Sequence, residues 1–122
     1  MENDDALDEN INWNHTVYML GKLTDVIMVL VMGEGDARSR LREAIPFLQR
    51  VVPGMLPSDC DIRKRVEWAY AILDEVYELH PFNSPETTTR RRIKNCTGAK
   101  IISELFGAWM DLSDLVHEHF RE

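Results

Sequence analysis

The sequence predicts an all-α protein, and more specifically an antiparallel four-helix bundle. Apolar residues recur every three or four positions along four segments, which is the pattern of amphipathic helices. Turns that contain glycine or proline separate these segments, and no segment alternates with the period of two that marks a strand. Because the connections are short, neighbouring helices are expected to run up and down within one domain, which also fits the length of 122 residues.

The first helix is expected over about residues 12–32, and the GEG triplet at 33–35 ends it. Its apolar positions at helical spacing are Trp13, Val17, Leu20, Leu23 (or Thr24), Ile27 and Leu30 (or Val31). Near its end the segment VIMVLVM is apolar on every side of a helix, which is more than a small bundle needs to bury.

The second helix is expected over residues 36–52, with Asp36 as its N-cap. The apolar pattern keeps its helical phase through Pro46, which favours one kinked helix over two separate pieces. Pro53 and Gly54 are expected to end it.

The third and fourth helices are expected over residues 59–80 and 85–120. Ser58 or Asp59 is the expected cap of the third, which would place Cys60 in its first turn. The residues that form its packing seam are Ile62, Val66, Ala69, Leu73, Val76 and His80. The fourth begins with Ser84 as a cap and Pro85 at the first helical position, a strong start signal.

Residues 1–10 are acidic and offer little to bury, so they are expected to form a mobile tail in front of a single domain at 11–122. This beginning has no apolar core of a signal peptide. The longest apolar run, 26–32, is far shorter than the roughly 20 residues that span a bilayer. We therefore expect a soluble cytoplasmic protein that makes no membrane contact.

The residue types that carry catalysis do not form a convincing constellation. The acid pairs at 75–78 and 111–114 are expected to lie far apart in an antiparallel bundle, and the two histidines of the HEH triplet at 117–119 face different ways on a helix. The two cysteines are far apart in sequence and form no metal-binding or redox motif. The expectation is a protein without enzymatic activity, cofactor or metal.

Basic clusters stand out in a chain whose net charge is −7. The starts of the second and fourth helices share one end of an up-and-down bundle, so their clusters are expected to merge into one basic surface. The residues of this surface are Arg38, Arg42, Arg90, Arg91, Arg92 and Lys94. Arg91, Arg92 and Lys94 have no acid four residues away to pair with, which favours a binding role for them. The alternative is that they form a solvated helix face, as runs of charge usually do.

The fourth helix carries two apolar stripes, one of which exceeds what a single contact needs. The first consists of Ile101, Leu105, Ala108, Leu112 and Leu115. The second, a candidate interface, consists of Ile102, Phe106, Trp109, Val116 and Phe120. A helix that is apolar over so wide an arc is either central in its own chain or covered by another chain, such as a second copy or a partner helix.

These observations favour a small helical interaction or regulatory module that binds a protein partner, of the inhibitor, immunity or assembly-subunit type, with homodimerisation as one form. The alternative is a nucleic-acid-binding protein that uses the basic surface, although the acidic balance of the chain argues against it. A weaker alternative is an enzyme whose site is assembled across an oligomer.

Overall fold

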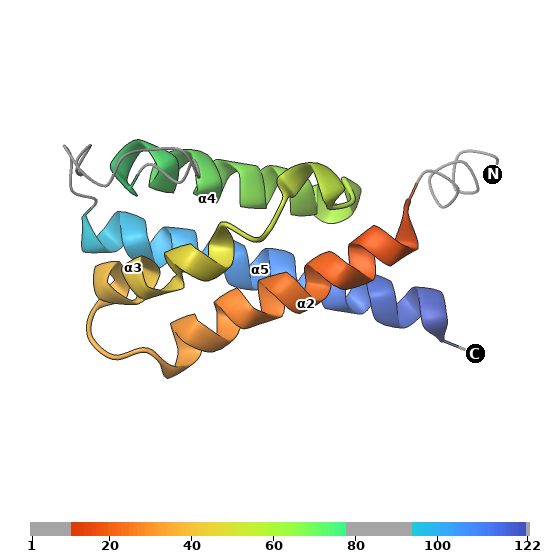
Figure 1. Ribbon diagram of the computed structural model, residues 1–122, viewed down its shortest axis with the longest axis horizontal. Helices are drawn as coiled ribbons and strands as arrows, with labels where there is room; N and C mark the ends of the chain where they lie inside the picture. The colour runs from red at the N-terminus through yellow and green to blue at the C-terminus, as the bar shows by residue number, and fades with distance from the viewer. Residues whose placement is uncertain (1–10, 78–93, 122) are drawn as a thin grey trace.

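The computed structural model describes residues 11–77 and 94–121, and over these residues it confirms the all-helical class, with four α-helices and no strand (Figure 1). The elements are α2 (Trp13–Met32), α3 (Ala37–Leu48), two short 3₁₀ turns η1 (Pro53–Met55) and η2 (Asp59–Asp61), α4 (Ile62–Tyr77) and α5 (Asn95–Phe120). The acidic segment 1–10, predicted to be mobile, lies outside the described residues.

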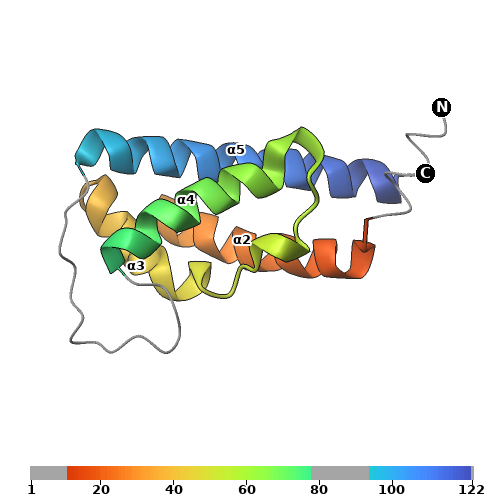
Figure 2. The ribbon, with the colours of Figure 1, turned by 90° about the horizontal axis from the view of Figure 1, so that it is seen from above.

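Helix α5 contacts all three of the other helices. Figures 1 and 2 show it extending along the length of the molecule, with α4 on one side and with α2 and α3 on the other. Its first predicted stripe is buried completely at Ile101, Leu105, Ala108 and Leu112, which join one hydrophobic core with residues of every other helix. The first stripe is therefore part of the core, with Leu115 half-buried at its end.

The contacts between α2 and α5 follow opposite orders along the two helices. Trp13, at the start of α2, stacks on His119, near the end of α5, with 3.6 Å between ring centroids. Thr24, further along α2, accepts a hydrogen bond from Trp109, ten residues earlier in α5. The two ends of the described chain consequently lie side by side (Figure 1).

Helix α4 is tied to α5 by polar contacts at its edge. Arg65 forms an ion pair with Asp111 at 2.8 Å and a longer one with Glu104 at 3.8 Å, while Lys100 lies over the ring of Trp68. Here too the later residue on α4 meets the earlier residue on α5. The acid at position 111 is thus engaged by an arginine of the same chain.

The first helix matches its predicted bounds, but its buried face differs from the predicted one. Asn12 caps α2, because its side chain accepts a hydrogen bond from the backbone N–H of His15. The buried residues are Thr16, Met19, Leu23, Val26, Ile27 and Leu30, whereas Val17, predicted to point inward, is 42% exposed. A helix that is apolar on several sides does not reveal which side its neighbours will cover.

The second helix ends at Leu48, so its predicted extension to residue 52 is wrong. Pro46 lies in the last turn of α3, where the helix ends shortly afterwards instead of continuing beyond a kink. Proline has no N–H to donate, and the chain then tightens through bonds from Arg50 to Phe47 and from Val51 to Leu48. The preserved apolar phase beyond Pro46 reflects Val51 entering the core from a turn.

The third helix begins at Ile62, three residues later than predicted. Cys60 and Asp61 have φ angles of 55° and 57°, which belong to the left-handed region, so Cys60 is not in a helical first turn. Ser58 precedes the 3₁₀ turn but makes no capping hydrogen bond with its side chain. The predicted end at residue 80 lies outside the described residues.

The fourth helix was predicted to run from residue 85, yet at Lys94 the backbone is extended and α5 begins at Asn95. An uninterrupted helix through Lys94 is therefore excluded, and residues 85–93 lie outside the described part of the chain. Positive charge is unfavourable in the first turn of a helix, which is consistent with a start after the basic run.

Candidate functional site

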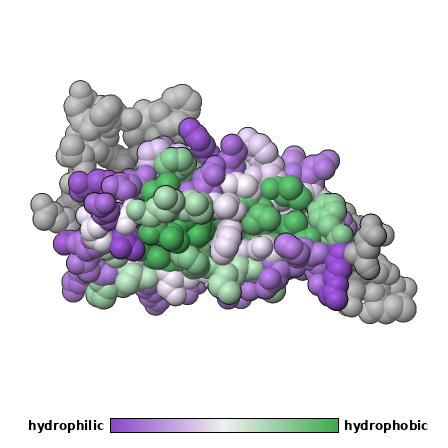
Figure 3. All heavy atoms as spheres, turned by 90° about the horizontal axis from the view of Figure 1, so that it is seen from below, coloured by the Kyte–Doolittle hydropathy of each residue, from purple (hydrophilic) through white to green (hydrophobic). Residues whose placement is uncertain are grey.

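One face of α2 exposes apolar side chains to solvent along most of the helix. This surface, the α2 outer face, consists of Val17, Tyr18, Gly21, Met28, Val31 and Met32. Its large side chains are between 42% and 72% exposed. Figure 3 views the molecule from the side on which α2 lies and shows hydrophobic side chains gathered along the middle of that surface, with hydrophilic ones around them. Contiguous exposed apolar surface of this kind marks binding sites in soluble proteins.

The second stripe of α5, predicted as an interface, is largely used inside the chain. Ile102, Phe106, Trp109 and Val116 are only partly exposed and pack against the core. The indole N–H of Trp109 donates to the hydroxyl of Thr24 at 2.9 Å, so the stripe lines the seam with α2. Only the end of the stripe is open.

Phe120 is 59% exposed, and it meets the Trp13 ring edge-on. Met110, which belongs to neither apolar stripe, is 54% exposed on α5. The exposed apolar surface thus belongs mainly to α2, and the VIMVLVM segment was the sequence signal that pointed to it.

Helix α2 also satisfies the length and composition of a membrane-crossing helix, as the single such helix among the described residues. A helix that contributes to the core of a soluble protein satisfies the same criteria, and the inner side of α2 does contribute six buried residues here. The seven-residue run at 26–32 understates how apolar the complete helix is.

The starts of α3 and α5 lie against each other, as the prediction of a shared basic end requires. A methyl group on Gly98 would lie only 3.2 Å from the Cβ atom of Ala37. Of the predicted basic residues, Arg38, Arg42 and Lys94 are described near these helix starts, and the last two are well exposed. Arg90, Arg91 and Arg92 lie outside the described residues.

The described part of this basic end contains a permanent negative charge. The backbone N–H of Ser39 donates to Asp36 at 3.0 Å, and this bond, with further bonds from the Ser39 hydroxyl and the Asn95 side chain, lowers the pKa of Asp36 to about 2. Arg38 pairs with the same carboxylate at 3.4 Å. The charge of Arg38 is therefore partly neutralised within its own helix start.

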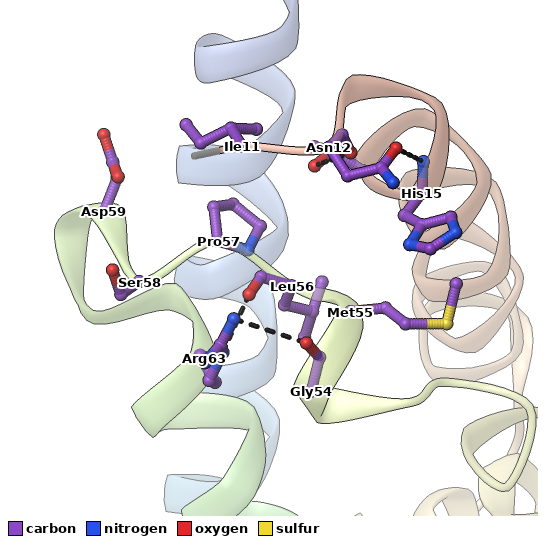
Figure 4. A pocket seen from close by; sticks show the side chains of 11 residues that line it. Ile11, Asn12, His15, Gly54, Met55, Leu56, Pro57, Ser58, Asp59 and Arg63 are labelled. Carbon is purple, nitrogen blue, oxygen red and sulfur yellow. Dashed lines mark hydrogen bonds between the residues drawn. The ribbon is translucent and has the colours of Figure 1, made fainter. Parts of the chain in front are cut away.

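A pocket of about 250 Å³ lies between the start of α2 and the segment that leads into α4 (Figure 4). Arg63 holds that segment by donating to the carbonyl oxygens of Leu56 at 2.8 Å and Gly54 at 3.3 Å. His15 and Asp59 also line the pocket. Because the guanidinium is already bonded to backbone and the lining also contains the acidic Asp59, the pocket offers no concentrated charge for a ligand.

Among the described residues, no group of three or more histidine, cysteine or acidic side chains is close enough to hold a metal ion. His119 stacks on an indole, and both cysteines are exposed free thiols. The prediction that the chain has no catalytic constellation is not tested by this finding and stays a prediction.

Comparison with known proteins identifies no relative. No protein family, no curated protein and no solved structure shows significant similarity to this chain.

Proposed function

We propose that this chain is a non-enzymatic interaction module, an antiparallel four-helix bundle that binds a protein partner through the α2 outer face. The observation that carries the proposal is the exposure of Val17, Met28 and Val31 on a helix whose opposite side is core. The opposite order of contacts along α2 and α5, and along α4 and α5, supports the antiparallel arrangement.

Burying this face would release water from apolar surface, which is the main favourable contribution to protein association. Each of the exposed methionine and valine side chains would contribute about 1–2 kcal/mol if it were buried completely, because apolar burial is worth roughly 25 cal/mol per Å². A methionine such as Met28 also adapts its shape to irregular partner surfaces. The face is therefore suited to a helix or sheet of another protein.

The test is an affinity purification from the source organism with three forms of the full chain as bait. We expect the wild type and the control Val52→Glu to capture the same identified protein, and Met28→Glu/Val31→Glu to lose it. Val52 is 46% exposed but follows α3, so the control introduces one glutamate, against two in the test variant, at a similar exposure away from the face. The captured protein is then purified, and its binding to the three forms is measured directly. Equal capture by all three forms, or no partner for the wild type, contradicts the proposal.

A second candidate is an anionic partner, nucleic acid included, at the end formed by the starts of α3 and α5. The exposure of Arg42 and Lys94 near these starts favours it, while the ionised Asp36 opposes it. A retardation assay at low and moderate salt with Arg42→Glu/Lys94→Glu and Arg91→Glu/Arg92→Glu distinguishes the two functions. Binding that falls steeply with salt and is lost in both variants supports this candidate function. If the wild type shifts no nucleic acid even at low salt, the candidate function is excluded.

A further inference from the structure

The charges of α2 are arranged on one flank of its apolar outer face. Lys22 and Asp25 are the only two residues of this 20-residue helix that belong to the Lys, Arg, Asp and Glu set. At 3.6 residues per turn they lie about 60° apart around the helix axis, on the side that also carries Tyr18. The ammonium group of Lys22 lies 4.9 Å from the centre of the Tyr18 ring, which holds it along this flank.

Two opposite charges on the same flank are complementary to a second copy of the same helix only in one orientation. If two α2 helices pack antiparallel about a two-fold axis, the same flanks meet, so Lys22 of each copy faces Asp25 of the other. If the helices pack parallel, opposite flanks meet and the pairs do not form. We propose that the α2 outer face binds a second copy of this chain, with the two α2 helices antiparallel and crossing between Lys22 and Asp25.

The shape of the face suits this arrangement. Positions 17, 21, 28 and 31 follow one line along the face, and Thr24, at the edge of the face beside α5, completes the alternating steps of four and three that are typical of a packing seam between helices. Gly21 stands near the crossing point, and a Cβ atom there would meet nothing within 4 Å, so two backbones have room to approach. Val17 of one copy then lies opposite the Met28–Val31 segment of the other, and the apolar ends cover each other.

The charges of α2 also favour a second copy of the chain over a lipid bilayer as the partner of this face. A bilayer offers no partner to Lys22 and Asp25, which stand near the middle of α2, and charges at that depth are costly. Two copies supply both partners. The two charges sum to zero, so two chains of net charge −7 meet at this face without local repulsion. This inference rests on the proposed function and names the partner.

The test is a charge exchange measured by sedimentation velocity over a range of protein concentrations. The wild type is expected to reach twice the chain mass. Lys22→Asp alone places two acids on the flank and Asp25→Lys alone places two lysines, so each is expected to weaken self-association by about tenfold or more. A mixture of these two variants is expected to form a mixed dimer, and Lys22→Asp/Asp25→Lys is expected to restore self-association.

Both positions are accessible in the single chain, so all variants are expected to keep the helical circular dichroism of the wild type. Single variants that associate as tightly as the wild type overturn the inference and place any dimer at another surface. A monomeric wild type also overturns it, and flotation with vesicles of neutral and anionic lipid then tests the membrane. The two proposals can fail separately. If the wild type is monomeric but still captures a different protein through Met28 and Val31, the dimer is excluded and the proposed function is retained.

Discussion

The indole nitrogen of Trp109 donates a hydrogen bond to the hydroxyl of Thr24, with 2.9 Å between the nitrogen and the oxygen. The same hydroxyl donates to the carbonyl oxygen of Leu20 at 2.6 Å, so both functions of the threonine are used. This side-chain pair ties the middle of α2 to α5 at the edge of the outer face. The bond shows that Trp109, a member of the second apolar stripe of α5, is used in a contact within the same chain.

Replacing Thr24 by valine keeps the shape of the side chain but removes the acceptor of this bond. We expect Thr24→Val to lower the free energy of unfolding by about 1 kcal/mol, the net worth of one hydrogen bond, because the half-buried indole N–H is left without its partner. Thr24→Ser keeps the hydroxyl and is expected to be closer to the wild type. Urea unfolding at one protein concentration measures all three, and a valine variant more stable than the serine variant contradicts the bond.

The helical class and the start of α2 could be predicted because they depend on local signals. Asn12, directly before Trp13, provides a capping side chain, and the apolar repeat of the first helix continues to the glycine that ends it. Pro46 is a harder case. Its effect depends on where in the helix it falls, and the apolar phase continued past it because Val51 reaches the core from a turn. A periodic pattern does not distinguish these two geometries.

The surfaces were harder to predict than the core. An all-round apolar segment such as VIMVLVM indicates excess apolar surface, but only the packing of α2 shows that Met28 and Val31 are the exposed members. Similarly, Phe106 and Trp109 looked like an interface in sequence because the acceptor of the Trp109 bond lies 85 residues away. The left-handed conformation of Cys60 opposes its local preference, so no sequence rule predicts it.

The pKa of Asp36 implies a defined dependence of stability on acid. The pKa is about 2 in the folded chain, against an ordinary value of 3.8, so the folded state favours the carboxylate. Its contribution to stability is therefore complete above about pH 5 and is lost as the pH falls through 3.8 towards 2. Asp36→Asn retains a capping side chain without the titration.

The measurement compares urea unfolding of the wild type and Asp36→Asn between pH 5 and pH 2. We expect the wild type to lose stability relative to the variant over this interval, whereas above pH 5 the difference between them is expected to be constant. A difference that does not change with pH would mean that the bond from Ser39 does not hold the carboxylate in solution.

Two glycines of α5 are expected to respond oppositely to alanine. At Gly107 the added methyl group meets the tip of Arg65, whose Nη1 atom would lie 3.0 Å away and can move. Alanine improves the propensity of a helix interior by about 1 kcal/mol, so Gly107→Ala is expected to raise the free energy of unfolding by up to that amount. Displacing Arg65 weakens its ion pair with Asp111. Because both side chains are about one-third exposed, this loss is expected to be smaller than the gain in helix propensity.

At Gly98 the same methyl group lies 3.2 Å from Ala37 Cβ and 3.4 Å from Leu41 Cδ1. The Cβ atom of Ala37 is fixed to its backbone, so α3 must move away from α5. We expect Gly98→Ala to lower the free energy of unfolding by about 1 kcal/mol, since overpacking outweighs the gain in helix propensity. Thermal unfolding of the two variants side by side gives the sign of each, and a stabilised Gly98→Ala would disprove the close approach of α3 and α5.

Cys60 holds a left-handed backbone conformation, with φ of 55° and ψ of 25°, two residues before the start of α4. This conformation costs a non-glycine residue roughly 1–2 kcal/mol, whereas glycine adopts it freely. We expect Cys60→Gly to raise the free energy of unfolding by up to about 1 kcal/mol, because the greater freedom of glycine in the unfolded chain offsets part of the relief.

Cys96 is the matched control, since it is also an exposed free thiol but lies in the first turn of α5. There glycine relieves no strain and loses helix propensity, so Cys96→Gly is expected to cost up to about 1 kcal/mol. Both variants remove one thiol, and urea unfolding under reducing conditions therefore isolates the backbone effect. If both changes destabilise the chain equally, the turn before α4 carries no strain, and Cys60 occupies a conformation that its neighbours make favourable.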